Sequence, residues 1–417
     1  MTKPILLCLL LAAAPALGAD ATKPAATAVN ALGIDLLAHA VKPGANTVLS
    51  PYSIQIALAM TYAGAEGETR EEMARVLHYP AGEVHTGFSA LQKDLAGITE
   101  RTTKLARQAK ETGGPSEPIT LAIANRLFGQ KGYDFRPAFL AFLKDKYEAP
   151  LEQLDFTKNP SAAAGLINAW VAKQTRDRIR NLVPEDALND LTRLVLVNAI
   201  YLKAPWAEEF NQNATEPRPF HLAGGQSTKA PTMVRKDSFG YLKRDGYTAV
   251  TLPYTGGELQ FLILLPDEPD GLPALERKLS ASLLAECATL KAQDVLLYLP
   301  KFKLEPPLFQ LSKTLQALGM KNAFDIPQGS ANFDGIAPRR PNDYLYISDV
   351  FHKTFVEIDE KGTEAAAATA VVMMRAMAMP VEKKPVEVRV DRPFLFAIQH
   401  RASGACLFLG RVVNPGL

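Results

Sequence analysis

Residues Phe355–Pro380 read FVEIDEKGTEAAAATAVVMMRAMAMP and combine two local patterns that meet at Gly362. Before Gly362, apolar residues are interleaved with acids, an alternation that predicts a half-buried strand. Gly362 permits a bend because it lacks a Cβ. After the bend, the run Ala365–Met374 carries no charge at all. The sequence therefore predicts a strand, a turn and an uncharged segment near the C-terminus.

Alanine dominates the uncharged segment and by itself favours a helix. Alternation gives a second interpretation, in which Glu364 lies on one face and the small or apolar residues lie on the other. The residues on that second face are Thr363, Ala365, Ala367, Thr369, Val371 and Met373. A segment of this kind can be buried on one face as an added β-strand.

The motif EKGTEAAAAT at Glu360–Thr369 resembles the reactive-loop hinge of the serpins. The resemblance implies an α+β fold with about eight or nine helices around three β-sheets. It also implies an exposed reactive-centre loop at about residues 360–385, which inserts into the main sheet after a protease cleaves it. Its hinge would comprise Glu360, Gly362, Thr363, Glu364, Ala365, Ala366, Ala367 and Ala368. The segments Pro393–Phe396 and Leu407–Pro415 are also similar to serpin C-termini.

Counting from the hinge as is usual in the family, Ala376 precedes the scissile bond and Met377 follows it. A small residue in this position implies an elastase-like or subtilisin-like serine protease as the partner. Arg375 is the alternative, because a trypsin-like pocket would select it regardless of the count. Both possibilities remain open from the sequence.

Five further residues match serpin positions around the main sheet. The resemblance assigns them to the shutter beneath the sheet and to the entry point of the loop: Ser50, Ser53, Asn198, Trp206 and His352. Helix capping explains the two serines equally well, because Pro51 is tolerated in a first helical turn. Trp206 is equally compatible with ordinary core packing. Asn198 interrupts an apolar run, and a buried amide must find hydrogen-bond partners or cost about 1–3 kcal/mol.

Composition and the N-terminus predict an exported protein. Met1–Gly18 has a basic start, a short apolar core and small residues at its end, which together are typical of a cleaved signal peptide. Residues 19–417 would then form a single domain, secreted or periplasmic, and a monomer. The balance of 46 basic and 44 acidic residues gives no electrostatic case for nucleic acid. No apolar run reaches about 18 residues, so we expect no membrane partner.

The remaining chain predicts alternating helices and strands, with helices expected at 162–179, 273–290 and 309–318. In the first of these, Arg176-Asp177-Arg178 stands where serpins usually have glycine, which leaves the turn in doubt. A basic row at spacing three runs through residues 101–110 and is better explained as a solvated face than as a polyanion site. Cys287 and Cys406 are expected to be buried thiols rather than a disulfide.

No sequence motif for catalysis, metal binding or phosphate binding was found, and the six histidines are scattered. We therefore expect neither enzymatic activity nor a catalytic residue, metal or cofactor. The favoured hypothesis is an inhibitor that acts as a suicide substrate. The alternatives are a non-inhibitory serpin with a binding or chaperone-like role and, less favoured, a secreted hydrolase.

Overall fold

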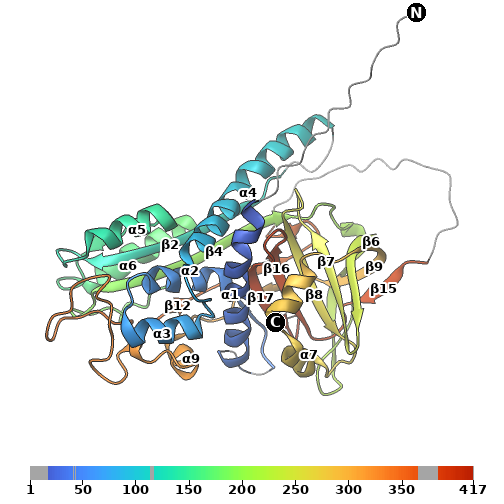
Figure 1. The fold of residues 1–417 in the computed structure, drawn as a ribbon. Coiled ribbons are helices and arrows are strands. Elements are labelled where there is room, and N and C mark those ends of the chain that lie inside the picture. The colour runs from blue at the N-terminus through green and yellow to red at the C-terminus, as the bar shows by residue number, and fades with distance from the viewer. Residues whose placement is uncertain (1–16, 41, 43, 113–116, 365–383, 417) are drawn as a thin grey trace, which may run out of the picture.

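The structure is a computed structural model that describes residues 17–40, 42, 44–112, 117–364 and 384–416. Two large β-sheets form its frame, and helices pack along them (Figure 1). The described residues contain nine α-helices: α1 (Leu17–His39), α2 (Pro51–Tyr62), α3 (Gly67–Val76), α4 (His85–Thr112), α5 (Pro137–Tyr147), α6 (Pro160–Gln174), α7 (Leu272–Lys278), α8 (Ala281–Cys287) and α9 (Ser312–Ala317). Two 3₁₀ turns lie at Gln212–Ala214 and Asn322–Phe324.

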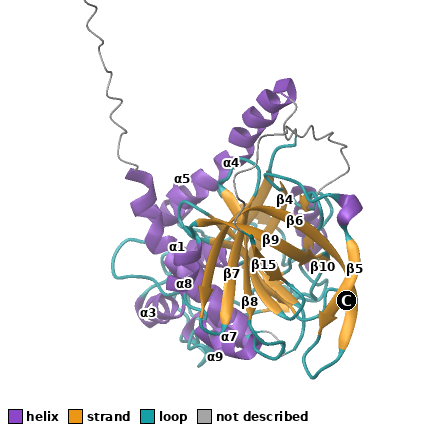
Figure 2. Cartoon of the chain, turned by 90° about the vertical axis from the view of Figure 1, so that its right-hand side faces the viewer, coloured by secondary structure: helices purple, strands orange, loops and turns teal. Residues whose placement is uncertain are grey.

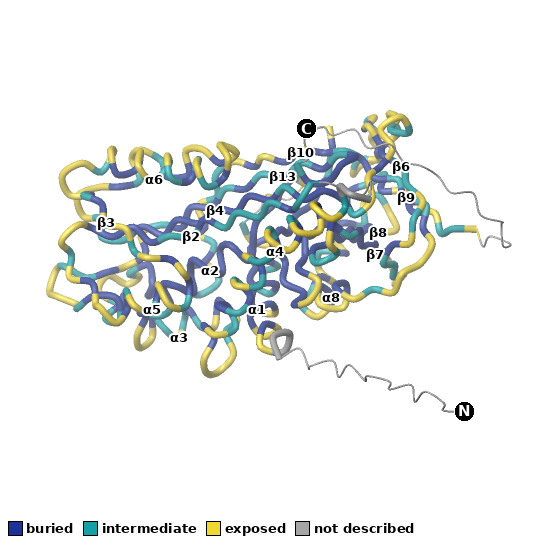
Figure 3. The backbone as a smooth tube through the Cα atoms, turned by 90° about the horizontal axis from the view of Figure 1, so that it is seen from above, coloured by how far each residue is buried: buried dark blue, intermediate teal, exposed yellow. Residues whose placement is uncertain are grey.

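The six-stranded sheet is the one that receives the hinge. Its strand order is β10-β13-β14-β4-β2-β3. The strands are β2 (Thr120–Gln130), β3 (Glu152–Leu154), β4 (Leu194–Pro205), β10 (Phe302–Leu304), β13 (Val356–Ile358) and β14 (Gly362–Thr363). Strand β4 is apolar and buried along most of its length, as the uninterrupted apolar run of its sequence predicts. Helix α6 lies along β2 and β4 in the view from above (Figure 3).

The nine-stranded sheet carries the C-terminal strands and curves strongly (Figure 2). Its strands follow the order β1-β17-β16-β8-β7-β6-β9-β15, and β5 pairs with β6. They are β1 (Thr47–Leu49), β5 (Glu216–His221), β6 (Ser227–Arg244), β7 (Tyr247–Pro253), β8 (Leu259–Pro266), β9 (Ala292–Pro300), β15 (Val386–Arg389), β16 (Phe394–His400) and β17 (Cys406–Val412). A third, two-stranded sheet pairs β11 (Phe309–Gln310) with β12 (Phe351–His352).

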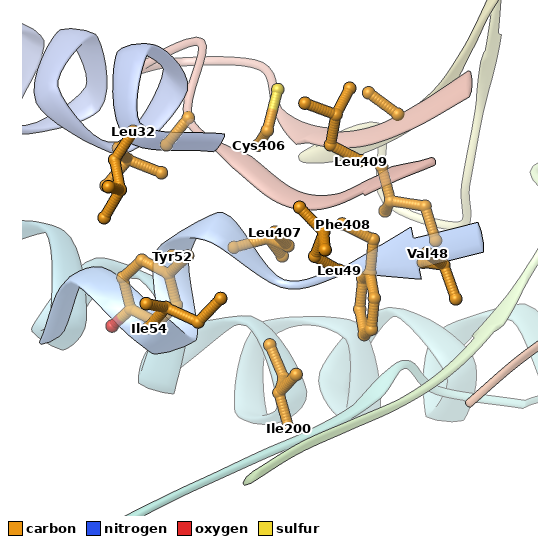
Figure 4. Packing of buried hydrophobic residues seen from close by; sticks show 14 of the residues in the cluster. Leu32, Val48, Leu49, Tyr52, Ile54, Ile200, Cys406, Leu407, Phe408 and Leu409 are labelled. Carbon is orange, nitrogen blue, oxygen red and sulfur yellow. The ribbon is translucent and has the colours of Figure 1, made fainter. Parts of the chain in front are cut away.

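The main core lies where α1, α2 and the strands β1 and β17 meet (Figure 4). Leu32, Leu49, Tyr52 and Leu409 are among its fully buried side chains. Close packing of this kind makes the core rigid, because even a one-methylene change in volume is felt by its neighbours. Cys287 and Cys406 are buried free thiols, as expected from the sequence.

Three helical predictions were wrong in extent. The helix predicted at 162–179 corresponds to α6, which ends at Gln174. It stops there because Arg176 and Asp177 adopt left-handed backbone angles that an α-helix cannot contain. Residues 273–290 form two helices, since Leu279 is extended and Ser280 caps α8 through a hydrogen bond to the Leu283 amide.

The third prediction missed a strand. Phe309 and Gln310 pair with β12, so the helix α9 begins only at Ser312. Pairing with a strand more than 40 residues away overrides the local helical pattern here. At the N-terminus, α1 begins at Leu17, within the last two residues of the predicted signal peptide. Among the described residues, none of the helices is long and apolar enough to cross a membrane.

Candidate functional site

The hinge begins with a tight turn between β13 and β14. The carboxylate of Asp359 accepts hydrogen bonds from the amides of Lys361, at 2.8 Å, and Gly362, at 3.2 Å. The Asp359 amide donates to the Gly362 carbonyl at 3.0 Å, which closes the turn across its base. An aspartate side chain that binds amides two and three residues ahead favours such a turn. The turn therefore reverses the chain and directs the next residues back into the sheet.

Gly362 is required for close approach to β4. Its φ is +149°, and a Cβ at this position would lie 2.1 Å from the Ala204 carbonyl oxygen. A contact this short cannot be relieved by a side-chain rotation, because the atom it meets belongs to the backbone of a buried strand. Gly362 thus allows β14 to enter between β13 and β4.

Thr363 is the first hinge side chain inside the protein. It pairs with Ala204 on β4 and Ile358 on β13, and its side chain is buried. Its hydroxyl forms a 2.6 Å hydrogen bond with the hydroxyl of Tyr254. The Tyr254 ring stacks on Trp206, with ring centroids 4.7 Å apart and planes 5° apart. Thr363 is the one residue of the predicted small-residue face that the structure describes, and its side chain points into the protein.

Trp206 lies directly beneath the hinge turn. Its indole N–H donates to the Asp359 carbonyl at 2.9 Å, and its amide donates to the Lys361 carbonyl at 2.8 Å. The ring is fully buried and also contacts Phe210 and Phe261 edge-on. Trp206 is thus both a core residue and a support for the turn, so core packing and a role at the entry point of the loop are compatible.

Glu360 connects the turn to two other segments of the chain. Its carboxylate pairs with the Lys301 ammonium at 2.7 Å and accepts from the Thr215 hydroxyl at 2.8 Å. Burial raises the pKa of this carboxyl, but the bonds from Lys301 and Thr215 outweigh burial and hold the pKa below its usual value. Neither Lys301 nor Thr215 was singled out by the sequence, because no local pattern connects them with Glu360.

Glu364 follows the last residue of β14 and adopts a left-handed φ of +48°, so the strand alternation is not continued at this residue. It forms an ion pair with the guanidinium of Arg178, and only 10% of its side chain is exposed. Burial raises the pKa of Glu364, and Arg178 offsets only part of the rise. Arg178 follows two left-handed residues, Arg176 at φ +50° and Asp177 at φ +63°. The turn that lacks the expected glycine is therefore the one that presents Arg178 to the hinge.

A second polar group lies under the sheet and joins four of the predicted residues. The hydroxyl of Ser53 donates to the Asn198 side-chain oxygen, and the Asn198 amide donates to the Ser53 carbonyl and, at 2.6 Å, to Asn125. Ser50 caps α2 by accepting from the Ser53 amide at 3.3 Å. The amide of Ser50 donates to His352 Nε2 at 3.0 Å. Asn198 thus has partners for both ends of its amide.

His352 is held neutral in this group. It is fully buried, and burial lowers its pKa to about 3. Since Nε2 accepts a hydrogen bond, the neutral ring carries its proton on Nδ1, which has no partner among the described residues. The serpin resemblance assigned His352 and Asn198 to the same polar group, and within that group the ring of His352 bonds to Ser50. Ser50 therefore has both roles considered from the sequence: it caps α2 and it belongs to this polar group.

The remaining predicted positions, Ala365–Ala368, Arg375, Ala376 and Met377, lie outside the described residues. The site that can be described is therefore the base of the loop: Glu360 lies in the turn, Gly362 and Thr363 pair in the sheet, and Glu364 follows them. Tyr254 and Arg178 complete this base, and sequence reasoning missed both as contacts of the hinge.

One grouping in the described part of the chain has the residue types of a metal site: Asp94, Glu258 and His400. The Arg101 guanidinium donates to both carboxylates, at 3.1 Å to Asp94 and 2.5 Å to Glu258. A cation of the protein thus already binds both acids and offsets one of their two negative charges. Arg101 belongs to the basic row of α4, and Lys104 in the same row pairs with Glu100, which fits the predicted solvated face.

Comparisons with known proteins agree with this geometry. The family model described as "Serpin (serine protease inhibitor)" matches residues 27–415. A leukocyte elastase inhibitor of Bos taurus is 39% identical over 382 residues, covering 89% of this chain and 94% of the relative. An uncharacterised serpin-like protein of Thermococcus kodakarensis is 38% identical over 396 residues, covering 94% and 86%.

A solved structure described as "Cleaved Serpin 42Da" is 31% identical, with a TM-score of 0.77. It is covered over 99% of its length by 94% of this chain. The family model describes protease inhibitors rather than catalysts. With a match over nearly the whole chain, and with nine helices, three sheets and the expected hinge in the described residues, this chain belongs to the serpin family.

Proposed function

We propose that this protein is an exported serine-protease inhibitor that acts as a suicide substrate. The observation that carries the proposal is the seated hinge. Gly362 and Thr363 already form a strand between β13 and β4. Below them, residues 194–203 of β4 pair with β2 on one side and with no other strand among the described residues. The sheet thus has an edge against which the loop can extend β14.

The register of β14 specifies how that extension would run. Thr363 lies opposite Ala204 in an antiparallel pair, so each later loop residue would meet the preceding residue of β4. In this register Thr369 would lie opposite Asn198, and Met373 opposite Leu194. The alternate residues from Ala365 to Met373 would face the same side as Thr363. Their small side chains matter, because overpacking a core typically costs about 1–3 kcal/mol.

The chemistry requires only the protease's own nucleophile. The protease serine oxygen attacks the carbonyl carbon of Ala376, an ester forms, and the peptide bond to Met377 breaks. The amine of Met377 takes the proton and leaves with the C-terminal part of the loop. The freed strand then enters the sheet before water hydrolyses the ester. From Thr363 to Arg375 it would span roughly 40 Å at about 3.3 Å per residue, and the protease would be carried that far.

The class of target protease and the location of this protein are proposed from the sequence. Ala376 favours a protease with a small or apolar primary pocket, and Arg375 would favour a trypsin-like one. The bovine relative named as an elastase inhibitor supports the first choice. The signal-like segment Met1–Gly18 supports export to the periplasm or the outside of the cell. The small, uncharged hinge residues Ala365–Ala368 argue against the non-inhibitory alternative, because charged or bulky residues at these positions would block entry.

The test is a covalent-complex assay. The purified protein is mixed with an elastase-like or a trypsin-like protease, boiled in detergent and separated on a gel. We expect a band at the sum of the two masses less the released C-terminal peptide, and mass spectrometry of that peptide identifies the cleaved bond. A catalytically dead protease serves as the control and should give no such band. Complete cleavage of the loop without any covalent complex would refute the inhibitory mechanism.

A further inference from the structure

A large hollow lies away from the hinge and is lined by residues of the C-terminal half of α1, of helix α7 and of the end of β17. Figure 1 shows where these three elements lie. Its volume is about 830 Å³. Most of its surface is apolar, with Ile34 and Leu37 from α1 on one wall and Leu272 from α7 on the other. Small-molecule sites in proteins are mostly apolar hollows of about 300–1,000 Å³. The hollow therefore has the size and lining of a site for an organic molecule.

A buried arginine forms part of the lining. The Arg411 side chain is 5% exposed. It donates to the Ala45 carbonyl at 2.9 Å, to Glu276 at 2.6 Å and to the Lys42 carbonyl. A guanidinium has five N–H donors, so two of them have no acceptor among the described residues. Buried donors without acceptors favour a ligand that brings oxygen atoms.

A second arginine lies at the rim. Arg277 lines the hollow, is exposed, and forms no ion pair within the described residues. The two acids of the lining are already engaged, because Glu276 binds Arg411 and Asp270 accepts the Gly224 amide at 3.0 Å. Among the described residues Arg277 and Asp270 both lack an ion pair, but the Asp270 carboxylate already accepts the Gly224 amide, so Arg277 is the lining charge with neither an ion pair nor a hydrogen bond that engages it.

We propose that this hollow binds a small amphipathic organic anion, an alkyl or aryl carboxylate. The apolar part would lie against Leu37 and Leu272, which would remove hydrocarbon surface from water. The carboxylate would accept hydrogen bonds from the free donors of Arg411 and pair with Arg277 at the rim. Guanidinium groups suit carboxylates because their planar donors match the two oxygens. The site is independent of the loop and of protease inhibition.

The test measures binding of three ten-carbon probes to the purified protein by isothermal titration calorimetry. We expect decanoate to bind with one site per chain and about tenfold more tightly than decanol, which corresponds to about 1.4 kcal/mol, because a hydrogen bond to a charged group is stronger than one to a neutral group. Decyltrimethylammonium should bind no better than decanol. Equal affinity for decanoate and decanol, or tighter binding of the cation, would overturn the proposed recognition.

Variants place the probe in the hollow. Ala223→Trp fills the space from an exposed turn and should abolish decanoate binding, whereas Ala81→Trp, in an exposed loop that does not line the hollow, should leave it unchanged. Ala38→Trp, on the α1 side, repeats the test from another wall. Arg277→Gln should weaken decanoate up to about fivefold, as expected for an exposed ion pair, and leave decanol unaffected. Normal decanoate binding in both filling variants, or none to the unmodified protein, would refute the site.

Discussion

The contact between Arg178 and Glu364 gives the sharpest prediction about how the hinge is held. Replacing Arg178 with alanine leaves a carboxylate whose side chain is only 10% exposed without its cation. The other oxygen of Glu364 already lacks a hydrogen-bond partner among the described residues. The substitution therefore acts on the seated strand β14 and leaves the core beneath it intact.

The size of the effect follows from the exposure of the two side chains. Removing one partner of a fully buried ion pair costs about 3–5 kcal/mol. Arg178 is 47% exposed, so solvent screens this pair and reduces the loss. We expect the seated hinge to lose about 1–2 kcal/mol, which corresponds to about a five- to thirtyfold rise in the population of the released hinge.

Hydrogen exchange at the hinge measures this population directly. The Glu364 amide donates to the Glu357 carbonyl at 3.0 Å and exchanges only when β14 leaves the sheet. In Arg178→Ala it should exchange about five- to thirtyfold faster. Arg180→Ala is the matched control, because Arg180 lies in the same segment, is 68% exposed and forms its ion pair with Asp177 rather than with the hinge.

The double variant separates loss of the pair from loss of the arginine. Adding Glu364→Gln to Arg178→Ala removes the unpaired charge, so part of the protection should return. Unchanged exchange in Arg178→Ala, or an equal effect of Arg180→Ala, would refute the view that this ion pair holds the hinge. An additive double variant would mean that the two side chains act separately.

The same carboxyl predicts a pH dependence. Burial raises the pKa of Glu364 above its usual value of 4.5 when the hinge is seated. The seated hinge therefore takes up a proton more readily than the released hinge, and its relative stability should increase as the pH falls through the raised pKa. Below a pH of about 4.5 Glu364 is protonated in both the seated and the released hinge, so the stability of the seated hinge should stop increasing. Glu364→Gln should abolish this dependence in the exchange experiment, after correction for intrinsic rates.

Three further predictions concern neighbouring positions. Thr363→Arg would place a guanidinium in the buried site beside Tyr254, so the protein should be cleaved as a substrate; undiminished covalent trapping would contradict entry through this hinge. Gly362→Ala should release β14 and speed Glu364 exchange, because the new Cβ would meet the β4 backbone at 2.1 Å; unchanged protection would contradict the register. Asp177→Gly should stabilise the protein by about 1 kcal/mol by relieving a left-handed φ, seen as a melting temperature about 1 °C higher, whereas Asp186→Gly at an ordinary φ should not.

Local chemistry predicted the elements around the hinge well. Alternation in the stretch at Phe355–Ile358 predicted β13, and the uninterrupted apolar run predicted the buried strand β4. Ser50 and Pro51 predicted the start of α2, because a capping hydroxyl and a proline in the first turn are local signals. Such features depend on neighbours within a few residues, so the sequence carries them by itself.

Contacts between distant segments were decided only by the tertiary structure. Tyr254 meets Thr363, and Arg178 meets Glu364, across more than 100 residues of chain in each case. The strand pairing of Phe309 and Gln310 likewise replaced the start of a predicted helix. A resemblance in the sequence predicted the hinge and its small residues. Which side chains hold it, and how firmly, depends on burial and on partners that the fold brings together, because the cost of a buried polar group is set by its surroundings rather than by its neighbours in the chain.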